Sequence, residues 1–166
     1  MLYELVEKLD RALSFKTAKA HCDIPCGIYD PIKAQLAALS VVRMLDLMRD
    51  LVDTHKERDV EFINTMTRLV HVKEEHAEEC KREIRVIWGD YIKASHLEAF
   101  PQLSGLVHKI MELGSKSRQT ADRQTGLALV EAVNEFAEIF WKTKGIATKK
   151  AKAPYAPGLE LVYPEL

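Results

Sequence analysis

The sequence predicts an all-α protein, an antiparallel up-down four-helix bundle preceded by a short N-terminal hook loop. Two observations predict this fold. Apolar residues recur at helical spacing in four segments that short loops connect, and no run of alternating apolar and polar residues lies between turn signals, as it would in a strand. The length of 166 residues favours a single domain, and 47% hydrophobic with 30% charged residues is typical of a globular chain.

The first two helices carry recognisable start signals. The first is expected from Asp30 to about Asp53, because Asp is a favoured cap residue and the proline that follows it is a favoured first helical residue. The second is expected from about Asp59 to Gly89. Its polar centre, KEEHAEECKRE at residues 73–83, weakens the apolar stripe, and its charges are interpreted as facing outward.

The third and fourth helices complete the expected bundle. The third runs from about Ser95 to Leu113 and is expected to stop at Gly114, because glycine is favoured just past a helix end. The fourth covers about residues 120–144 and is again followed by a glycine. The bundle is therefore expected to occupy residues 31–145.

The C-terminal tail, residues 146–166, changes character. Three prolines exclude a continuous helix there, so we expect an extended Pro-rich arm. Its anchors are expected to be Tyr155, Leu161, Val162 and Tyr163. The arm packs either on its own bundle or on a neighbouring subunit, and the pattern does not choose between the two.

Near the N-terminus, residues 2–15 carry apolar residues at helical spacing, which predicts a short amphipathic helix. Acidic residues at Glu4, Glu7 and Asp10 interrupt the apolar stretch, so the segment does not match a secretory signal. Two interpretations remain: a docking helix, or a leader that is later removed. Without an export signal, we expect a cytoplasmic protein in a reducing compartment.

Charge and hydropathy exclude two broad classes of partner. A net charge of −1 argues against a nucleic-acid binder that relies on a broad basic face. No apolar run reaches the length needed to span a bilayer, so no membrane partner is expected.

The chain contains three cysteines, and because this number is odd they cannot all pair with one another within the chain. Cys80 lies mid-helix and is interpreted as a core residue.

The other two cysteines lie in the hook loop at residues 21–30, within the stretch AHCDIPCGIYDP. The spacing of Cys22 and Cys26 is C-x-x-x-C, which differs from the C-x-x-C of thioredoxin-like redox proteins. A structural zinc site requires four ligands, usually two pairs of Cys or His residues, and the sequence offers no second pair. Two thiolates on so short a loop can still chelate one metal, with Pro25 stiffening the turn.

The missing ligands can come from the backbone if the chain is cut between Ala20 and His21. The new α-amine of His21, the deprotonated amide of Cys22 and the two thiolates would then surround a metal in one plane. A planar set of two nitrogens and two sulfurs suits Ni(II) or Cu(II), whereas Zn(II) prefers a tetrahedron. The imidazole of His21 would stand over this plane as an axial ligand.

At these residues the sequence resembles a known family. The stretch HCDIPCGIYDP resembles the nickel-binding hook of nickel-dependent superoxide dismutases. Three downstream stretches are also similar to that family: VIWGDYIK at residues 86–93, HLEAFPQL at 96–103 and IFWKTK at 139–144. The likeness covers about residues 21–144, and the hook is its most specific part.

The resemblance implies a fold, an assembly and a reaction. It implies a four-helix bundle assembled as a homohexamer with one nickel ion per subunit. It implies that a dedicated maturation protease removes the propeptide, residues 1–20. The implied reaction converts two superoxide radicals to dioxygen and hydrogen peroxide while nickel alternates between Ni(III) and Ni(II).

The resemblance also implies roles for individual residues. Cys22 and Cys26 would supply the thiolates, and His21 would supply the amine and the axial imidazole. Tyr29 would guard the mouth of the pocket, and Asp23 would help to hold the loop.

The sequence departs from the family at two supporting positions. The family has a Glu on the first helix and an Arg on the second that hold the axial imidazole, and the matching positions here are Ala37 and His76. We expect His76, or a water molecule, to replace this support in part.

Two other functions remain as alternatives at this point. The hook could capture nickel or copper for delivery without redox turnover, in which case neither the axial histidine nor Tyr29 would be needed. A purely structural helical oligomer would need neither hook cysteine.

Overall fold

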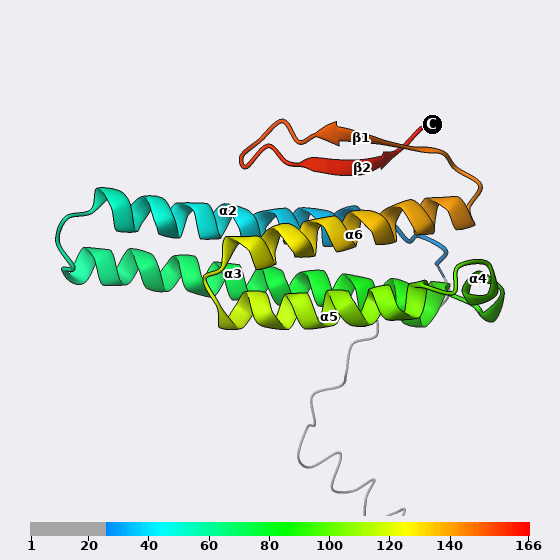
Figure 1. Cartoon of the computed structure of the whole chain (residues 1–166), viewed down its shortest axis with the longest axis horizontal. Helices are drawn as coiled ribbons and strands as arrows, with labels where there is room; N and C mark the ends of the chain where they lie inside the picture. The colour runs from blue at the N-terminus through cyan, green and yellow to red at the C-terminus, as the bar shows by residue number, and fades with distance from the viewer. Residues whose placement is uncertain (1–25) are drawn as a thin grey trace, which may run out of the picture.

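The computed structural model describes residues 26–166. The expected leader and the hook residues His21, Cys22, Asp23 and Pro25 lie outside the described residues. Four long helices make up most of the described chain (Figure 1). They are α2 (Ile32–Thr54), α3 (Val60–Val86), α5 (Leu103–Gln119) and α6 (Arg123–Thr143).

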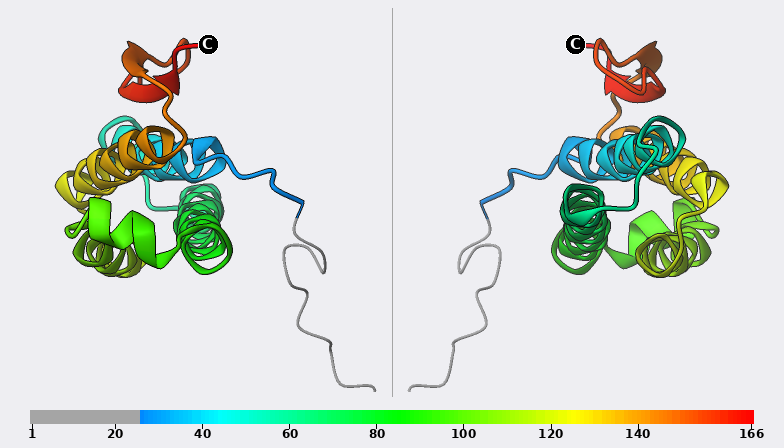
Figure 2. Two further views of the ribbon diagram at one scale, coloured as in Figure 1. Left: turned by 90° about the vertical axis from the view of Figure 1, so that its right-hand side faces the viewer. Right: turned by 90° about the vertical axis from the view of Figure 1, so that its left-hand side faces the viewer.

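These helices form the expected bundle. α2 packs against α3 and α6, and α5 packs against the same two helices. Viewed end-on, the four helices lie at the corners of a square (Figure 2). Neighbouring helices run in opposite directions, and α2 and α3 extend beyond α5 and α6 at the end where a loop joins α2 to α3 (Figure 1). The predicted antiparallel four-helix bundle is therefore confirmed. No helix among residues 26–166 has both the length and the apolar character that crossing a membrane requires.

Aspartates mark three helix starts, because their carboxylates accept hydrogen bonds from backbone N–H groups that have no partner within the helix. Asp30 Oδ1 accepts from the N–H of Ile32 at 2.8 Å, and Asp59 Oδ1 accepts from the N–H of Phe62 at 2.9 Å. Asp122 caps α6 in the same way. The expected starts of the first two helices thus agree with the structure to within about two residues.

The prediction of the third helix was wrong in two respects. A short helix α4 (Ala94–Ala99) is separated from α5, because Pro101 has no N–H to donate and its ring disfavours helical geometry in the preceding residue. α5 then continues past Gly114 to Gln119. A Cβ at position 114 would lie 2.7 Å from Cγ of Lys81 on α3. Gly114 therefore allows a close approach between α3 and α5 rather than ending a helix.

The helix that precedes α4 ends in an unusual turn. α3 passes directly into a π-helix, η1 (Ile87–Tyr91), within the motif VIWGDYIK. The N–H of Ile92 still bonds to the carbonyl of Ile87, at 3.1 Å. Single π turns are rare in proteins, but those that occur are often found at functional sites. Here η1 places Tyr91 beside Tyr29, at the end of the bundle where α2 begins.

The core lies between the four helices and is built mainly from aliphatic and phenylalanine side chains. Its largest fully buried side chains include Phe136, Phe140, Ile84, Leu103 and Ile110. Cys80 is also fully buried, as the interpretation of it as a core residue requires. Burial raises the pKa of its thiol to about 12, so at neutral pH it is not a thiolate.

The tail forms a β-hairpin, which was not expected from the sequence. β1 (Thr148–Lys152) pairs antiparallel with β2 (Glu160–Pro164), with Lys150 opposite Val162. Leu161 and Val162 are consecutive and both buried, so β2 shows no alternating pattern. The absence of a strand was therefore wrongly predicted from the absence of alternation. The hairpin lies on the bundle beside α2 and α6 (Figure 1).

Two buried amide side chains attach this hairpin to its own bundle. Gln35 on α2 donates from Nε2 to Oδ1 of Asn134 at 2.9 Å and to the carbonyl of Val162 at 3.0 Å. Asn134 on α6 donates to the carbonyl of Glu160 at 2.8 Å and accepts from the N–H of Val162 at 3.3 Å. Side chains of the bundle thus form hydrogen bonds with backbone groups on the edge of β2 that does not pair with β1.

Candidate metal centre

Cys26 lies just ahead of α2 and is exposed. It lines a pocket of about 340 Å³ between the start of α2 and the end of α3. Tyr29, Lys33 and Glu83 line the same pocket, together with apolar side chains such as Ile87. The structure therefore brings together two of the site residues expected from the sequence, Cys26 and Tyr29.

The backbone at Gly27 sets the direction of the chain between these two residues. Gly27 has a φ of 71°, in the left-handed region that residues with a Cβ rarely adopt. A Cβ there would meet no atom within 4 Å, so only backbone conformation restricts the position. The glycine after Cys26 is therefore required by the turn that leads from the cysteine to Tyr29.

Tyr29 is half-buried and packs on an aromatic cluster. Its ring centroid lies 5.6 Å from that of Tyr91 on η1. Tyr91 in turn lies 5.3 Å from the ring of His96 and 5.0 Å from that of Phe140. The Tyr91 hydroxyl shares a hydrogen bond of 2.7 Å with Oγ1 of Thr143. Such ring pairs add stabilisation beyond the area that they bury.

This cluster explains why stretches far apart in the sequence resemble one family. Tyr91 comes from VIWGDYIK, His96 from HLEAFPQL and Phe140 from IFWKTK. All three stretches meet at the end of the bundle that carries Tyr29. Their convergence on Tyr91 was missed, because nothing in the local sequence pattern shows which ends of helices meet.

Ala37 and His76 are placed apart from the pocket of Cys26. Ala37 is 2% exposed within the core. His76 lines a different hollow, between α2, α3 and the hairpin turn at Tyr155, and its Nδ1 lies 3.2 Å from Oε2 of Glu79. Within the described chain the structure does not bring His76 and Cys26 together, and the role of His76 as support stays a prediction.

The charged run at residues 73–83 was expected to face outward, but the side chains of Lys73, Lys81 and Glu83 are largely buried. Lys73 is 2% exposed, and its Nζ donates to the carbonyls of Ser117, Arg118 and Thr120 at the end of α5. Burial lowers the pKa of this ammonium group. The side chain of Glu83 is 12% exposed and faces the pocket of Cys26. The sequence alone does not reveal which of these charged residues are buried, because glutamates and basic residues occur on both the buried and the exposed face of α3.

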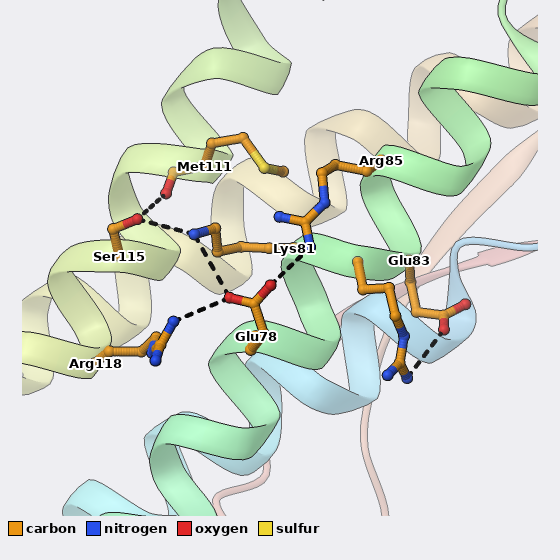
Figure 3. Close-up of polar contacts among 8 residues, drawn as sticks. Glu78, Lys81, Glu83, Arg85, Met111, Ser115 and Arg118 are labelled. Atoms are coloured by element: carbon orange, nitrogen blue, oxygen red, sulfur yellow. Dashed lines mark hydrogen bonds and ion pairs between the residues drawn. The ribbon is translucent and has the colours of Figure 1, made fainter. Parts of the chain in front are cut away.

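Other charges of this run do lie at the surface, where they contact α5. Glu78 accepts from Arg85 at 2.7 Å and from Arg118 of α5 at 3.1 Å (Figure 3). The hydrogen bond from Arg85, more than the nearby positive charges, lowers the pKa of the Glu78 carboxyl. This group connects α3 with α5 and does not reach the pocket of Cys26.

The donor chemistry of the pocket fits a nickel ion only in part. Within residues 26–166, no three side chains of His, Cys, Asp or Glu come together to hold a metal. Cys26 offers a soft sulfur donor that is exposed and next to an apolar pocket, which suits Ni(II) bound through thiolate. The other ligands predicted from the sequence, His21 and Cys22, lie outside the described residues.

Comparison with known proteins gives a consistent result. The family model described as nickel-containing superoxide dismutase matches residues 16–144. The matched range contains the hook, the bundle and the aromatic cluster, whereas β1 and β2 lie beyond it.

Individual relatives agree with the family model. A nickel superoxide dismutase of Streptomyces coelicolor is 35% identical over 128 residues, which cover 77% of this chain and 91% of the relative. The corresponding protein of Streptomyces seoulensis is 34% identical over 125 residues, 75% of this chain and 88% of the relative. A native nickel superoxide dismutase structure has a TM-score of 0.65 at 35% identity, covering 75% of this chain and 99% of that one. The chain therefore belongs to the family of nickel-containing superoxide dismutases.

Proposed function

We propose that this chain is made as a precursor and becomes a nickel superoxide dismutase when cleavage frees the amine of His21. As a member of its family the protein is an oxidoreductase that uses nickel and acts on superoxide. The observation that carries the proposal for the site is the shared pocket of Cys26 and Tyr29, which lies at the N-terminal end of the bundle within the matched range.

The proposed ligands are the thiolates of Cys22 and Cys26, the α-amine and imidazole of His21, and the deprotonated amide of Cys22. When bound, nickel supplies a one-electron couple, Ni(III)/Ni(II), through which superoxide is converted to dioxygen and hydrogen peroxide. Anionic sulfur and amidate donors favour the higher oxidation state of the metal, and soft thiolates suit this role. The exposed position of Cys26 supports the assignment, because a buried thiol such as Cys80 holds its proton.

Tyr29 is proposed to limit access to the metal. Its ring is half-buried against Tyr91, so it stays at the edge of the pocket that Cys26 lines. Limited access matters because thiolates are oxidised by peroxide, the product of the reaction. Asp23 and Pro25 are proposed to hold the loop in its turn, the first by bonding to backbone N–H groups and the second by its fixed φ.

Maturation is part of the proposal. Residues 1–20 are proposed to be a propeptide, which a maturation protease removes by cutting between Ala20 and His21. The chemical reason is that the lone pair of a peptide nitrogen at His21 is delocalised into the neighbouring carbonyl, so before cleavage this nitrogen is a poor donor and the planar ligand set is incomplete. The full-length chain should therefore bind nickel weakly and lack activity.

The assembly and location are also proposed. A homohexamer is supported by apolar side chains exposed at the α2–α3 end of the protomer, with Val60 83% and Ile63 58% exposed. Patches of this kind mark sites of association. A cytoplasmic location is supported by the need of the hook for reduced thiols.

One experiment tests the proposed function. Protein purified from its native host is analysed for metal content, sequenced from its N-terminus and assayed by pulse radiolysis for catalysed decay of superoxide. We expect about one nickel ion per chain, His21 as the first residue and catalysis. Cys26→Ser should abolish both nickel binding and catalysis, while Cys80→Ser, the matched change at a buried thiol, should retain both. Nickel binding without catalysed decay would instead support a nickel delivery protein.

A further inference from the structure

The outer strand of the C-terminal hairpin, β1, has an edge that no other part of the described chain covers. β2 lies between β1 and the bundle, so β1 is the strand farther from the helices (Figure 1 and Figure 2). The family match ends at residue 144, whereas β1 begins at Thr148. This edge therefore belongs to a part of the chain that lies beyond the match to nickel superoxide dismutases.

The register of the hairpin shows which backbone groups point outward from β1. The N–H of Ala153 donates to the carbonyl of Leu159, so the odd-numbered residues of β1 bond to β2. In an antiparallel pair, the residues between them direct their N–H and C=O groups to the opposite edge. Lys150 and Lys152 are such residues. Val162, which is opposite Lys150, likewise directs its own N–H and carbonyl away from β1, to side chains of the bundle.

The outward backbone groups of β1 are unpaired donors and acceptors. Within residues 26–166, those of Lys150 and Lys152 have no hydrogen-bond partner. An open strand edge is a template to which another extended segment can add as a further strand. Gln35 and Asn134 hold β2 through buried hydrogen bonds, so the hairpin presents this edge in a fixed position. Binding to a preorganised edge costs less conformational entropy than binding to a mobile one.

Lysines determine the charge of the outer edge. β1 has the sequence TKKAK, and the side chains of Lys149, Lys150 and Lys152 are exposed. Successive side chains of a strand point to opposite faces, so positive charge lies on both faces of this edge. Nζ of Lys150 lies 3.1 Å from Oε1 of Glu138 on α6. Lys149 and Lys152 form no ion pair in the part of the chain that the structure describes, although Glu160 is opposite Lys152 in the register.

These charges decide which segment can occupy the edge. Antiparallel pairing of two copies of β1 about Lys150 would place the two Lys150 side chains directly opposite each other, and like charges in that position are destabilising. A strand rich in Asp and Glu would instead place opposite charges across from the lysines on both faces. We propose that the outer edge of β1 binds an acidic, extended segment of a partner protein, which adds to the hairpin as a third strand. The proposal is independent of the proposed function, because no ligand of the nickel site takes part.

A purely protective role for the lysines predicts a different result. Lysines on an edge strand discourage pairing with other chains, and an edge with this role alone would bind no added strand. Docking of an acidic strand requires both the charges of the lysines and the outward N–H and C=O groups. The two roles are therefore separated by changing the charge and the backbone donor one at a time.

The test uses the full-length protein and a dye-labelled peptide of repeated Glu-Glu-Val units, with a peptide of Lys-Lys-Val units as its control. Fluorescence anisotropy at physiological ionic strength measures the Kd. We expect saturable binding of the acidic peptide and none of the basic one. On binding, hydrogen exchange should become slower at the amides of Lys150 and Lys152. It should stay unchanged at the amide of Ala153, which already donates to Leu159.

The contribution of charge is measured with two double variants. Lys149→Glu combined with Lys152→Glu should raise the Kd by at least about tenfold, because two attractive cross-strand pairs become repulsive. Lys56→Glu combined with Lys109→Glu is the matched control. It changes the net charge equally, but at exposed positions in the loop between α2 and α3 and on α5. Because distant surface charges are screened by salt, this control should change the Kd by less than about twofold.

The contribution of the backbone is measured at Lys150. Lys150→Pro removes the outward N–H and leaves the bonds between β1 and β2, since proline is tolerated where an edge N–H faces solvent. Lys150→Gln removes the same charge but keeps the N–H. We expect the Kd of Lys150→Pro to be about fivefold above that of Lys150→Gln, as the loss of one hydrogen bond implies. Unchanged hydrogen exchange at Ala153 in each variant confirms that the hairpin is formed.

Each outcome either supports or overturns the proposal. Failure of the acidic peptide to bind would overturn it and leave the lysines with a protective role alone. Equal Kd values for Lys150→Pro and Lys150→Gln, with the hairpin formed, would show attraction by charge without an added strand. Binding of oligothymidylate as tight as that of the acidic peptide would assign the lysines to nucleic acid and would also overturn the proposal. Nickel content and decay of superoxide are measured separately, so none of these results contradicts the proposed function.

Discussion

The rings of Tyr29 and Tyr91 lie 5.6 Å apart, with their planes tilted by 43°. This contact joins the segment that follows Cys26 to the π-helix at the end of α3. It is one link between residues 26–30 and the core, because Tyr91 also packs on buried Phe140. Loss of Tyr91 should therefore affect both stability and the position of Tyr29.

Tyr91→Ala is expected to lower the free energy of unfolding by about 2–3 kcal/mol, somewhat less than for a fully buried aromatic ring. It should also lower kcat/KM for superoxide, because Tyr29 loses the surface on which it packs. Urea unfolding and pulse radiolysis measure the two effects. Tyr91→Phe is the control: it keeps the ring and removes only the hydrogen bond to Thr143, so it should cost about 1 kcal/mol and leave activity nearly unchanged. Equal activities for the two variants would argue against a supporting role for the ring.

The turn at Gly27 gives a second prediction. Gly27→Ala forces a residue with a Cβ into a φ of 71°, at a cost of about 1–2 kcal/mol. The loop can avoid this strain by turning differently, which moves Cys26 relative to Tyr29. We expect the Kd for nickel of the processed protein to rise by about tenfold, as isothermal titration calorimetry would show.

Gly105→Ala provides the matched control for that change. Position 105 lies in α5, has no unusual φ and leaves open space for a Cβ. The substitution should leave nickel affinity unchanged and raise the free energy of unfolding by about 0.5–1 kcal/mol, through helix propensity. Nickel affinities that match the unmodified protein in both variants would show that the left-handed turn at Gly27 does not position the thiolate.

The bundle could be predicted from the sequence because its signals are local. Helical spacing of apolar residues, together with capping residues such as Asp30 and Asp59, fixes where helices begin and which faces are buried. The hook was predicted from the same kind of local signal, because its His, Cys and Pro residues lie within six positions of one another. Local signals of this kind need no knowledge of how the helices meet.

The features that were missed depend on contacts between distant residues. The hairpin is held by Gln35, which lies 127 residues before its partner Val162, and no pattern within the tail reveals this bond. Gly114 is explained only by Lys81 on another helix. Glu83 is one of several glutamates in a charged run, and only the packing of α2 against α3 sets it apart. Contacts of this kind become visible only when the helices are placed together.

Asn134 gives a third prediction, on the attachment of the hairpin. Its side chain accepts from Gln35 and from the N–H of Val162, and it donates to the carbonyl of Glu160. Asn134→Ala leaves buried polar groups without partners, which should cost about 2–3 kcal/mol. Hydrogen exchange at Val162 should become faster, because local opening of β2 is easier.

Glu135→Ala is the matched change one residue further along α6, at an exposed side chain. Surface changes of this kind usually alter stability by less than about 0.5 kcal/mol. We therefore expect no change in the exchange rate at Val162. Similar exchange rates for Asn134→Ala and the unmodified protein would mean that burial of Leu161 and Val162 alone holds the hairpin.

The lowered pKa of the Glu78 carboxyl gives a prediction of how the stability of the bundle depends on pH. The hydrogen bond from Arg85, followed by nearby positive charges, lowers the pKa of the Glu78 carboxyl below its value of 4.5 in the unfolded chain. Because the folded state then binds the proton less readily, the contribution of Glu78 to stability is fully present above pH 4.5 and is lost as the pH falls through the folded pKa. Glu78→Gln should lower the free energy of unfolding by less than about 1 kcal/mol at pH 7, since the pair is partly exposed.

The difference between Glu78→Gln and the unmodified protein should therefore shrink as the pH falls below 4.5 and should be smaller in high salt, which screens exposed charges. Urea unfolding at several pH values measures it. Glu75→Gln is the control, because Glu75 is 62% exposed and its ion-pair partner within the described chain is His71 of its own helix. A difference for Glu78→Gln that stays constant from about pH 7 to below its folded pKa would mean that the contact with Arg85 and Arg118 acts through packing of the side chains and not through charge.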